Sequence, residues 1–117
     1  MSAGYHHFVI EQGATFGHVL TLKDSAGSLI DLTGYASAQM DLRKDPEQSS
    51  AVLSLTTGNS RIALGGSAGT VTLTVSASDT GSLAATDGVY DLEITDASSN
   101  TFRILEGTFT VRRGISR

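Results

Sequence analysis

Short runs of alternating apolar and polar residues, separated by turn residues, are the feature that most constrains the fold of this chain. In the clearest run, residues 70–76, Val71, Leu73 and Val75 share one side and hydroxyl-bearing residues occupy the other. Side chains of a β-strand alternate between its two faces, so this run predicts a strand that is buried on one face only. Nowhere do apolar residues recur at helical spacing over three turns. The sequence therefore predicts an all-β fold.

Further segments follow the same pattern and bring the expected number of strands to about eight or nine. Residues 29–32, 52–56 and 61–64 predict short strands. Longer strands are predicted near both ends and in the middle of the chain. In the first two, Phe8 and Ile10 share a side, and Phe16, Leu20 and Leu22 alternate with other residues; in two later strands the inward side chains are Ala36, Ala38, Met40 and Leu42, and Tyr90, Leu92 and Ile94. The first two of these are expected to be outer strands. Two packed sheets are the economical way for so many short strands to bury one face each.

The connections between these strands carry turn signals. Residues 23–28 predict a hairpin connection in which Gly27 takes a positive φ, with residues 29–32 pairing back across it. Residues 77–83 have poor strand propensity and follow Ser76, a residue that caps helices well. We therefore expect one short helical turn there, crossing between the two sheets.

The last predicted strand changes side along its length. Phe102 and Ile104 share one parity, whereas Leu105 and Phe109 share the other. A strand changes parity only where an extra residue is inserted, which is a β-bulge. Gly107 is the residue that we expect to accommodate the bulge.

Length, charge and cysteine content limit the function classes. The chain has 117 residues, the size of one domain, so we expect residues 1–117 to form a single sandwich. Residues 1–100 hold 11 acidic against 4 basic residues, and the basic residues of 101–117 are all arginines. A body this acidic lacks the basic face that nucleic-acid binding requires, so we expect no nucleic-acid partner. The absence of cysteine excludes disulfides and thiolate chemistry.

Membrane and secretory signals are missing from the sequence. No window approaches the roughly 18 apolar residues of a membrane span. Residues 1–7 lack the basic-then-apolar order of a signal peptide. We expect no membrane partner, and a soluble protein that is made and kept in the cytoplasm unless it leaves as part of a larger particle.

One catalytic motif matches literally. Residues 65–69 are Gly-Gly-Ser-Ala-Gly, the pattern of a nucleophile elbow around Ser67. The elbow needs a strand that turns into a helix, whereas residues 70–76 form the best strand of the chain. The three histidines also precede Ser67, which reverses the order of that catalytic triad. We therefore expect a Gly/Ser-rich loop and a chain that is not an enzyme.

The histidines and carboxylates lack a diagnostic metal spacing. His6 and His7 are adjacent, so in a strand they face opposite sides, and His18 can join only one of them. Turn and cap positions explain most of the scattered aspartates, which are Asp24, Asp31, Asp79, Asp87, Asp91 and Asp96. We expect no cofactor and no metal site, with a calcium ion held by a loop as the alternative.

Several phrases of the sequence resemble one known class of domain. In the first half they are residues 11–16, 24–27 and 31–35, and in the second half residues 69–75, 78–80, 88–94, 103–107 and 109–111. Together they resemble the small immunoglobulin-like β-sandwich domains of tailed-bacteriophage virion proteins, among them the N-terminal domain of baseplate upper proteins. The resemblance covers nearly the whole chain and implies a two-sheet immunoglobulin-like sandwich of about eight strands.

The same resemblance implies a function. We expect a non-enzymatic structural protein of the virion that binds other virion proteins, in many copies on a symmetric assembly. Because no coiled coil or receptor-binding module follows the domain, a small tail-associated adaptor at the baseplate, neck or fibre attachment is favoured. Capsid decoration is the alternative. A carbohydrate-binding module is a further alternative, although the chain has no Trp and only three Tyr for a sugar platform.

Two segments are expected to contact partners. One is near the N-terminus and comprises Tyr5, His6, His7 and Phe8, which we expect to be exposed. The other is the basic end of the chain, with Arg112, Arg113 and Arg117 as the expected contacts.

Overall fold

The computed structural model describes residues 4–23, 26–47 and 50–114, and these contain eight strands. The strands are β1 (Gly4–Glu11), β2 (Phe16–Thr21), β3 (Tyr35–Arg43), β4 (Leu53–Thr56), β5 (Ile62–Leu64), β6 (Thr70–Val75), β7 (Thr86–Asp96) and β8 (Thr101–Arg112). A single 3-10 turn, η1 (Gly66–Ala68), precedes β6, and the short helix α1 (Ala77–Gly81) precedes β7. The predicted all-β class and the helical turn are both confirmed.

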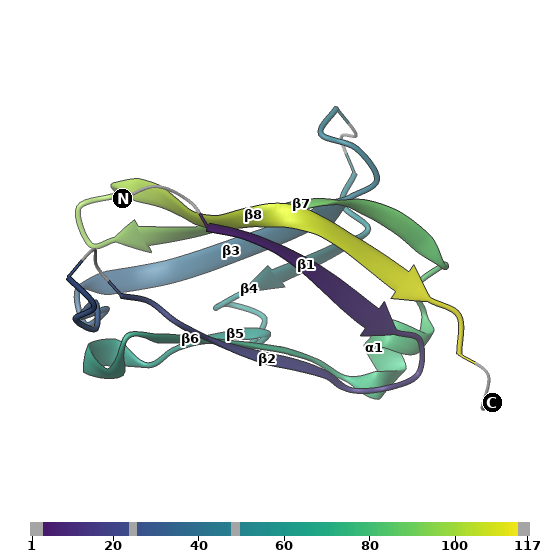
Figure 1. The fold of residues 1–117 in the computed structure, drawn as a ribbon, viewed down its shortest axis with the longest axis horizontal. Helices are drawn as coiled ribbons and strands as arrows, with labels where there is room; N and C mark the ends of the chain where they lie inside the picture. The colour runs from purple at the N-terminus through teal and green to yellow at the C-terminus, as the bar shows by residue number, and fades with distance from the viewer. Residues whose placement is uncertain (1–3, 24–25, 48–49, 115–117) are drawn as a thin grey trace.

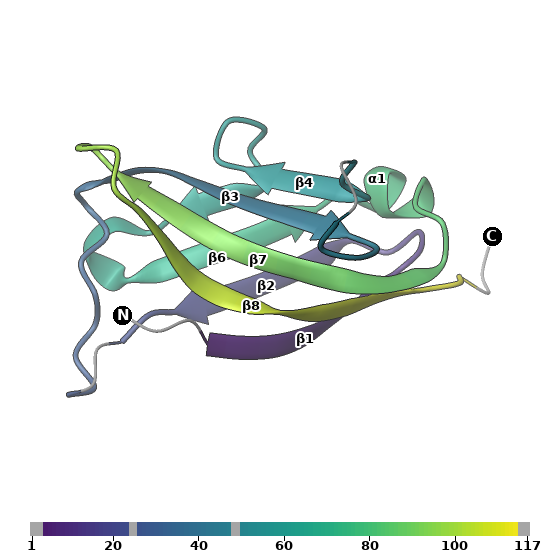
Figure 2. The same cartoon turned by 90° about the horizontal axis from the view of Figure 1, so that it is seen from above.

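The strands form two sheets packed face to face, as Figure 1 shows. One sheet has the order β1-β8-β7-β3-β4 and the other the order β2-β6-β5. In immunoglobulin terms, β2, β6 and β5 are strands B, E and D, and β4, β3, β7 and β8 are C′, C, F and G. The predicted immunoglobulin-like sandwich is therefore confirmed by the strand order itself. Seen from above, β1 lies at one edge of the five-stranded sheet and β4 at the other (Figure 2).

The core fills the space between the sheets and follows the predicted alternation. On β6 and β7 every predicted inward side chain is buried. The largest fully buried side chains are Phe109, Ile10, Leu32, Met40, Leu42, Leu55, Leu73, Leu92, Ile94, Val71, Val75 and Val111. On β3 the prediction is wrong for Ala36, which is exposed. The pairing of β3 with β7 shifts register between Tyr35 and Ser37, so the regular alternation begins only at Ala38.

Residues 29–32 were expected to form a strand, and that prediction is wrong. Only Lys23 and Leu29 form an isolated bridge, and the Ile30 amide donates to the Leu22 carbonyl at 2.9 Å. Gly27 has the predicted positive φ, of 85°. Part of the predicted hairpin connection, residues 24 and 25, lies outside the described residues.

The predicted bulge in β8 is present, but it does not lie at Gly107. The register of β7 against β8 shifts between Leu92 and Glu93, which leaves Ile104 as the extra residue beside Leu105. Ile104 and Leu105 are both buried, and this is why the apolar parity changes between them. Gly107 serves a different purpose, which concerns the packing of β1.

Helix α1 fixes the turn between β1 and β2. Its N-cap is Ser76, whose side chain accepts a hydrogen bond from the Asp79 amide. Thr80 is the buried polar residue of the helix, and its hydroxyl donates to the Ala14 carbonyl at 2.8 Å. The same hydroxyl accepts a hydrogen bond from the Gly13 amide at 3.1 Å. The end of β1 and the start of β2 are therefore held by one side chain of α1.

Replacement of this hydroxyl should weaken the fold. We expect Thr80→Val to lower the free energy of unfolding by about 1–3 kcal/mol, because the isosteric methyl leaves the Gly13 amide and the Ala14 carbonyl without their bonds. Urea unfolding followed by circular dichroism measures the change. The matched control is Thr74→Val, since Thr74 is exposed; we expect a change of under about 0.5 kcal/mol there. Equal losses in both variants would contradict the role of Thr80.

Candidate functional site

β1 is an edge strand of the five-stranded sheet, and it is the longest of the four edge strands in the described residues. All eight residues of β1 pair in parallel with β8, from Gly4 opposite Leu105 to Glu11 opposite Arg112. Natural proteins protect sheet edges with short strands, Pro, Lys or bulges, and β1 has none of these. β4, at the other edge of the same sheet, has only four residues. A long, regular and nearly uncharged edge is a template for pairing with another strand.

Two observations show which backbone groups of β1 face outward. The carbonyl of His6 lies against Gly107 of β8, and the Gln12 amide donates to the Arg112 carbonyl at 3.0 Å. Successive residues of a strand direct their backbone groups alternately to the two sides. The even-numbered residues of β1 therefore bond β8, and the amides and carbonyls of Tyr5, His7 and Val9 point away from it.

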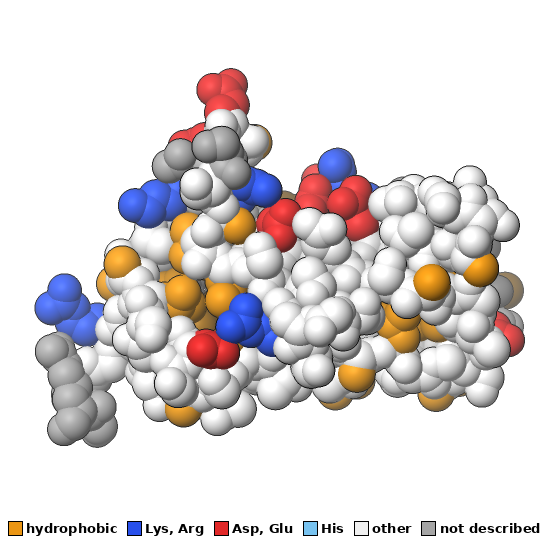
Figure 3. Space-filling view, turned by 180° about the vertical axis from the view of Figure 1, so that it is seen from behind, with side chains coloured by type: hydrophobic (Ala, Val, Ile, Leu, Met, Phe, Trp, Pro, Cys, Tyr) orange, Lys and Arg blue, Asp and Glu red, His pale blue; other side chains and the backbone are white. Residues whose placement is uncertain are grey.

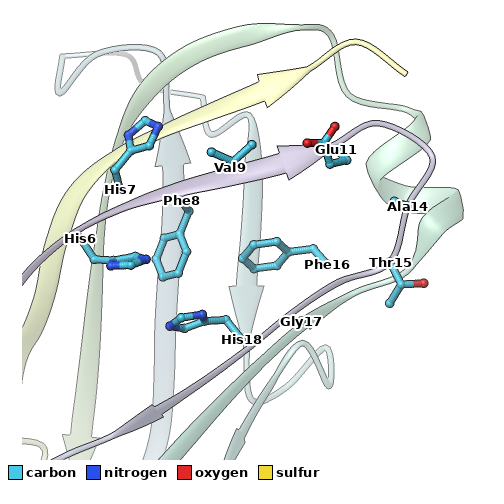
Figure 4. Close-up of a pocket in the computed structure, with 10 residues that line it drawn as sticks. All are labelled: His6, His7, Phe8, Val9, Glu11, Ala14, Thr15, Phe16, Gly17 and His18. Atoms are coloured by element: carbon cyan, nitrogen blue, oxygen red, sulfur yellow. The ribbon is translucent and has the colours of Figure 1, made fainter. Parts of the chain in front are cut away.

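Beside this edge, a hollow of about 340 Å³ opens between β1 and β2 (Figure 4). Phe8 lies at its base. The centroid of its ring is 5.7 Å from the ring centroid of Phe16 and 5.0 Å from that of His18. The His6 ring lies 4.6 Å from that of Phe8 and 5.2 Å from that of His18. The two sheets therefore meet here through an aromatic cluster of Phe8, Phe16, His6 and His18, which we call the aromatic seam.

The surroundings of His18 in the aromatic seam favour the neutral form of its imidazole. Burial, and after it the neighbouring His6, lower the pKa of His18 below its ordinary value of 6.5. The unfolded chain therefore binds a proton at His18 at a higher pH than the folded chain does. Above about pH 6.5 His18 is neutral in both states and does not weaken the fold.

This shift predicts that the protein loses stability over the pH interval that begins near 6.5 and extends downward to the lowered pKa of folded His18. His18→Gln should make the free energy of unfolding less dependent on pH across that interval, as urea titrations at several pH values would measure. The carboxylates with lowered pKa, those of Asp31, Asp79 and Asp96, have an ordinary value of 3.8 and contribute below this interval. An unchanged pH dependence in His18→Gln would contradict the assignment.

A hydrogen bond from the buried side chain of Tyr90 holds β1 in place. Tyr90 of β7 is opposite Gly107 of β8, and Gly107 is opposite His6 of β1. The Tyr90 hydroxyl donates to the His6 carbonyl at 2.6 Å. Burial raises the pKa of the Tyr90 phenol, so the group remains a hydrogen-bond donor at any physiological pH. A Cβ at position 107 would lie 2.1 Å from the His6 oxygen, so the glycine is required for the close approach of β1.

The face of β1 that carries Tyr5, His7 and Val9 is exposed to solvent. Tyr5 is 71% exposed and Val9 is 43% exposed, so both present apolar surface to solvent. Between them, His7 Nδ1 lies 2.6 Å from the Thr108 hydroxyl, and Nε2 lies 3.2 Å from the Thr110 hydroxyl. His7 is thus held in place by β8, between two exposed apolar side chains.

A second hollow, of about 630 Å³, lies on the outer face of the five-stranded sheet. Five of its six charged groups form ion pairs: Arg43 contacts Asp41 at 3.2 Å, and Arg103 contacts Asp91 at 3.2 Å and Glu106 at 3.9 Å. On the far side of the molecule, where β4 lies, charged side chains gather in only a few places (Figure 3). Most of that surface belongs to uncharged polar side chains and backbone.

The predicted N-terminal contacts all lie on β1, but the prediction that all four are exposed is wrong for one of them. Tyr5, His6 and His7 are exposed, whereas Phe8 is only 3% exposed. The side chain of Phe8 points between the sheets because its parity is that of Ile10, which is also buried. Phe8 therefore forms the base of the aromatic seam.

The predicted basic contacts lie at the other end of the same strand pair. Arg112 is exposed at the end of β8 and forms an ion pair with Glu11 at 3.1 Å. Arg113 is exposed beyond β8, and Arg117 lies outside the described residues. The structure does not bring these arginines to Tyr5, since Tyr5 is opposite Glu106, six positions earlier in β8.

The structure also places the candidate chemical residues. Ser67 is exposed in η1 and leads into a strand, so the geometry of a nucleophile elbow is not formed. In the described ranges, no three His, Asp or Glu side chains come together as a metal site would require. Asp31 and Asp96 accept hydrogen bonds from nearby turn residues, as predicted. None of the helices in the described ranges is long and apolar enough to cross a membrane.

Three residues of the site were not singled out as contacts from the sequence. Val9 lies on the exposed face of β1, and Phe16 and His18 complete the aromatic seam from β2. Alternation along residues 5–9 could have found Val9, since it shares the parity of Tyr5. The approach of His18 to His6 depends on how the two sheets pack, which no local pattern shows.

Comparison with known proteins gives little beyond the fold. No family model matches the chain, and no curated protein sequence matches it. Among solved structures it is similar to the extracellular domain of the voltage-gated sodium channel β4 subunit, described as a parallel homodimer with a role in cell–cell adhesion. That likeness has 13% identity and a TM-score of 0.45, over 98% of this chain and 97% of the other.

A second similar structure comprises extracellular domains 3–5 of Drosophila OTK. It has 18% identity and a TM-score of 0.36, over 90% of this chain and 32% of that one. Neither likeness is strong enough to bear on function. The immunoglobulin-like assignment rests on the strand order described above.

Proposed function

We propose that this chain is a non-enzymatic structural subunit of a tailed-bacteriophage particle, and that it binds other virion proteins through the outer edge of β1. The observation that carries the proposal is this edge: eight regular residues, with the backbone groups of Tyr5, His7 and Val9 directed outward. Strand addition at such an edge gives affinity through main-chain hydrogen bonds and needs no deep pocket.

The rest of the surface supports a binding role. Arg43 with Asp41 and Arg103 with Asp91 form ion pairs on the outer face of the five-stranded sheet, so a partner can cover these four groups without leaving any of them as a single buried charge. The sequence phrases that resemble phage domains form the β1–β2 turn, the entry to β3 and the strands β6, β7 and β8. We place the subunit in the tail, as an adaptor at the baseplate, neck or fibre attachment. Capsid decoration is the second candidate.

Electron microscopy of particles labelled with an antibody to this chain tests the proposal. Label at the tail tip or neck is the expected result. Label spread over the head would contradict a location in the tail and favour capsid decoration. The absence of label from the particle would contradict a virion role.

A pair of variants tests the surface in the same particles. Val9→Lys places a charge beside the outer edge of β1, whereas Val19→Lys places one on β2 in the other sheet; both valines are exposed. We expect Val9→Lys to reduce incorporation at least about tenfold, the equivalent of about 1.4 kcal/mol of binding, and Val19→Lys to leave it unchanged. The opposite order of effects would exclude the β1 edge.

A further inference from the structure

We infer that the outer edge of β1 pairs antiparallel with β1 of a second copy of this chain, with the two His7 residues opposite each other. The inference rests on the proposed function and deepens it, since it names a second copy of this chain as the virion protein that pairs with this edge. The two copies would be related by a two-fold axis, and their five-stranded sheets would join into one.

The parity of β1 restricts the register. Two antiparallel edges exchange hydrogen bonds only where outward-facing residues stand opposite one another. In β1 these residues are Tyr5, His7 and Val9, so a register centred on His7 bonds each Tyr5 to Val9 of the other copy. It also aligns residues 4–10 of both strands along their full length.

The exposed side chains are symmetric about the same centre. Tyr5 and Val9 are the large exposed apolar side chains of β1, and they stand two positions before and two positions after His7. Antiparallel pairing about His7 places each Tyr5 beside Val9 of the second copy, and an aromatic ring beside a β-branched side chain is a favourable cross-strand pair. Each molecule thus supplies both halves of the contact.

The neighbouring register fits less well. Centred on Phe8, it would pair the same number of residues, but it would place Tyr5 opposite Glu11. The Glu11 carboxylate already forms an ion pair with Arg112 at 3.1 Å. Residues 4–10 carry no Asp, Glu, Lys or Arg, so the register centred on His7 places none of these four residue types in the pairing.

On the inner side, the same register extends the aromatic seam. His6 would stand opposite Phe8 of the second copy, and the two seams would lie beside one another across the axis. The His6 and Phe8 rings already contact each other edge to face within one molecule. A second copy would therefore cover an aromatic opening that one molecule alone leaves to solvent.

Cysteine cross-linking gives a direct test, because the natural chain contains no cysteine. Residues directly opposite in a hydrogen-bonded antiparallel pair have Cα atoms about 5.5 Å apart, within the range for a disulfide. We expect His7→Cys to form a disulfide-linked dimer upon mild oxidation, much faster than Val19→Cys on β2. A mixture of Tyr5→Cys and Val9→Cys chains should form the mixed dimer in preference to either homodimer.

Light scattering of the unsubstituted chain supplies a test that does not depend on the cysteine variants. We expect a concentration-dependent dimer whose dissociation constant rises at least about tenfold in Val9→Lys and is unchanged in Val19→Lys. A chain that remains monomeric up to about millimolar concentration, or cross-linking of Val19→Cys as fast as that of His7→Cys, would overturn the inference. If virions are labelled but the chain does not dimerise, the proposed function stands and this inference fails. If the chain dimerises but virions carry no label, the dimer stands and the virion role fails.

Discussion

Phe109→Ala should lower the free energy of unfolding by about 3–5 kcal/mol, the usual cost of truncating a fully buried Phe. Phe109 is 0% exposed in the middle of β8, opposite Gly88 of β7. Its ring covers Gly88 so closely that a Cβ there would lie 2.5 Å from the ring. The space around the ring is therefore bounded by backbone, which cannot readily collapse into the cavity that alanine would leave.

Urea unfolding monitored by circular dichroism would measure this loss, which is a large part of the 5–15 kcal/mol typical of a domain. Phe102→Ala is the matched control, because Phe102 lies on the same strand but is 39% exposed. We expect its cost to be less than half that of Phe109→Ala. Similar losses at the two positions would mean that the core is not packed as described.

Gly107→Ala should have the second-largest effect, about 3 kcal/mol, and the loss should be concentrated at β1. The new Cβ would lie 2.1 Å from the His6 oxygen and 3.0 Å from the His6 carbonyl carbon, so the backbone of β1 must move away. The hydrogen bond from Tyr90 to the His6 carbonyl would be disturbed by the same movement.

Amide hydrogen exchange would locate this damage. We expect the amides of His6 and Phe8 to lose protection in Gly107→Ala, while those of β3 keep it. Gly17→Ala is the matched control, since a Cβ at position 17 of β2 would meet no atom within 4 Å. A uniform loss of protection across both sheets would contradict a local role for Gly107.

Much of the fold could be predicted because it depends on local alternation. The inward faces of β6 and β7 follow from period-two patterns in which each apolar side chain meets the core. Ala36 departs from its pattern because a register irregularity lies beside it, and such shifts arise from pairing between distant strands. Residues 29–32 are apolar apart from Asp31 but form no continuous ladder, since Leu29 bridges Lys23 while the Leu32 amide donates to a different segment, at Gly66.

The candidate site was harder to predict for a physical reason. An open edge is a property of the backbone and of strand order, and the parallel pairing of β1 with β8 joins residues about a hundred positions apart. The N-terminal segment was nevertheless singled out as a contact. The prediction of an exposed Phe8 treated the segment as uniformly exposed, although Phe8 shares its side of the strand with the apolar Ile10, and both are buried.

Amide hydrogen exchange along β1 tests most directly whether its outer edge binds the strand of a partner. In dilute protein, the amides of His6, Phe8 and Ile10 should be protected by β8, whereas those of Tyr5, His7 and Val9 should exchange rapidly. On association, the three outward amides should become protected while the inward ones change little. Outward amides that remain unprotected in every associated form would contradict a binding role for the β1 edge.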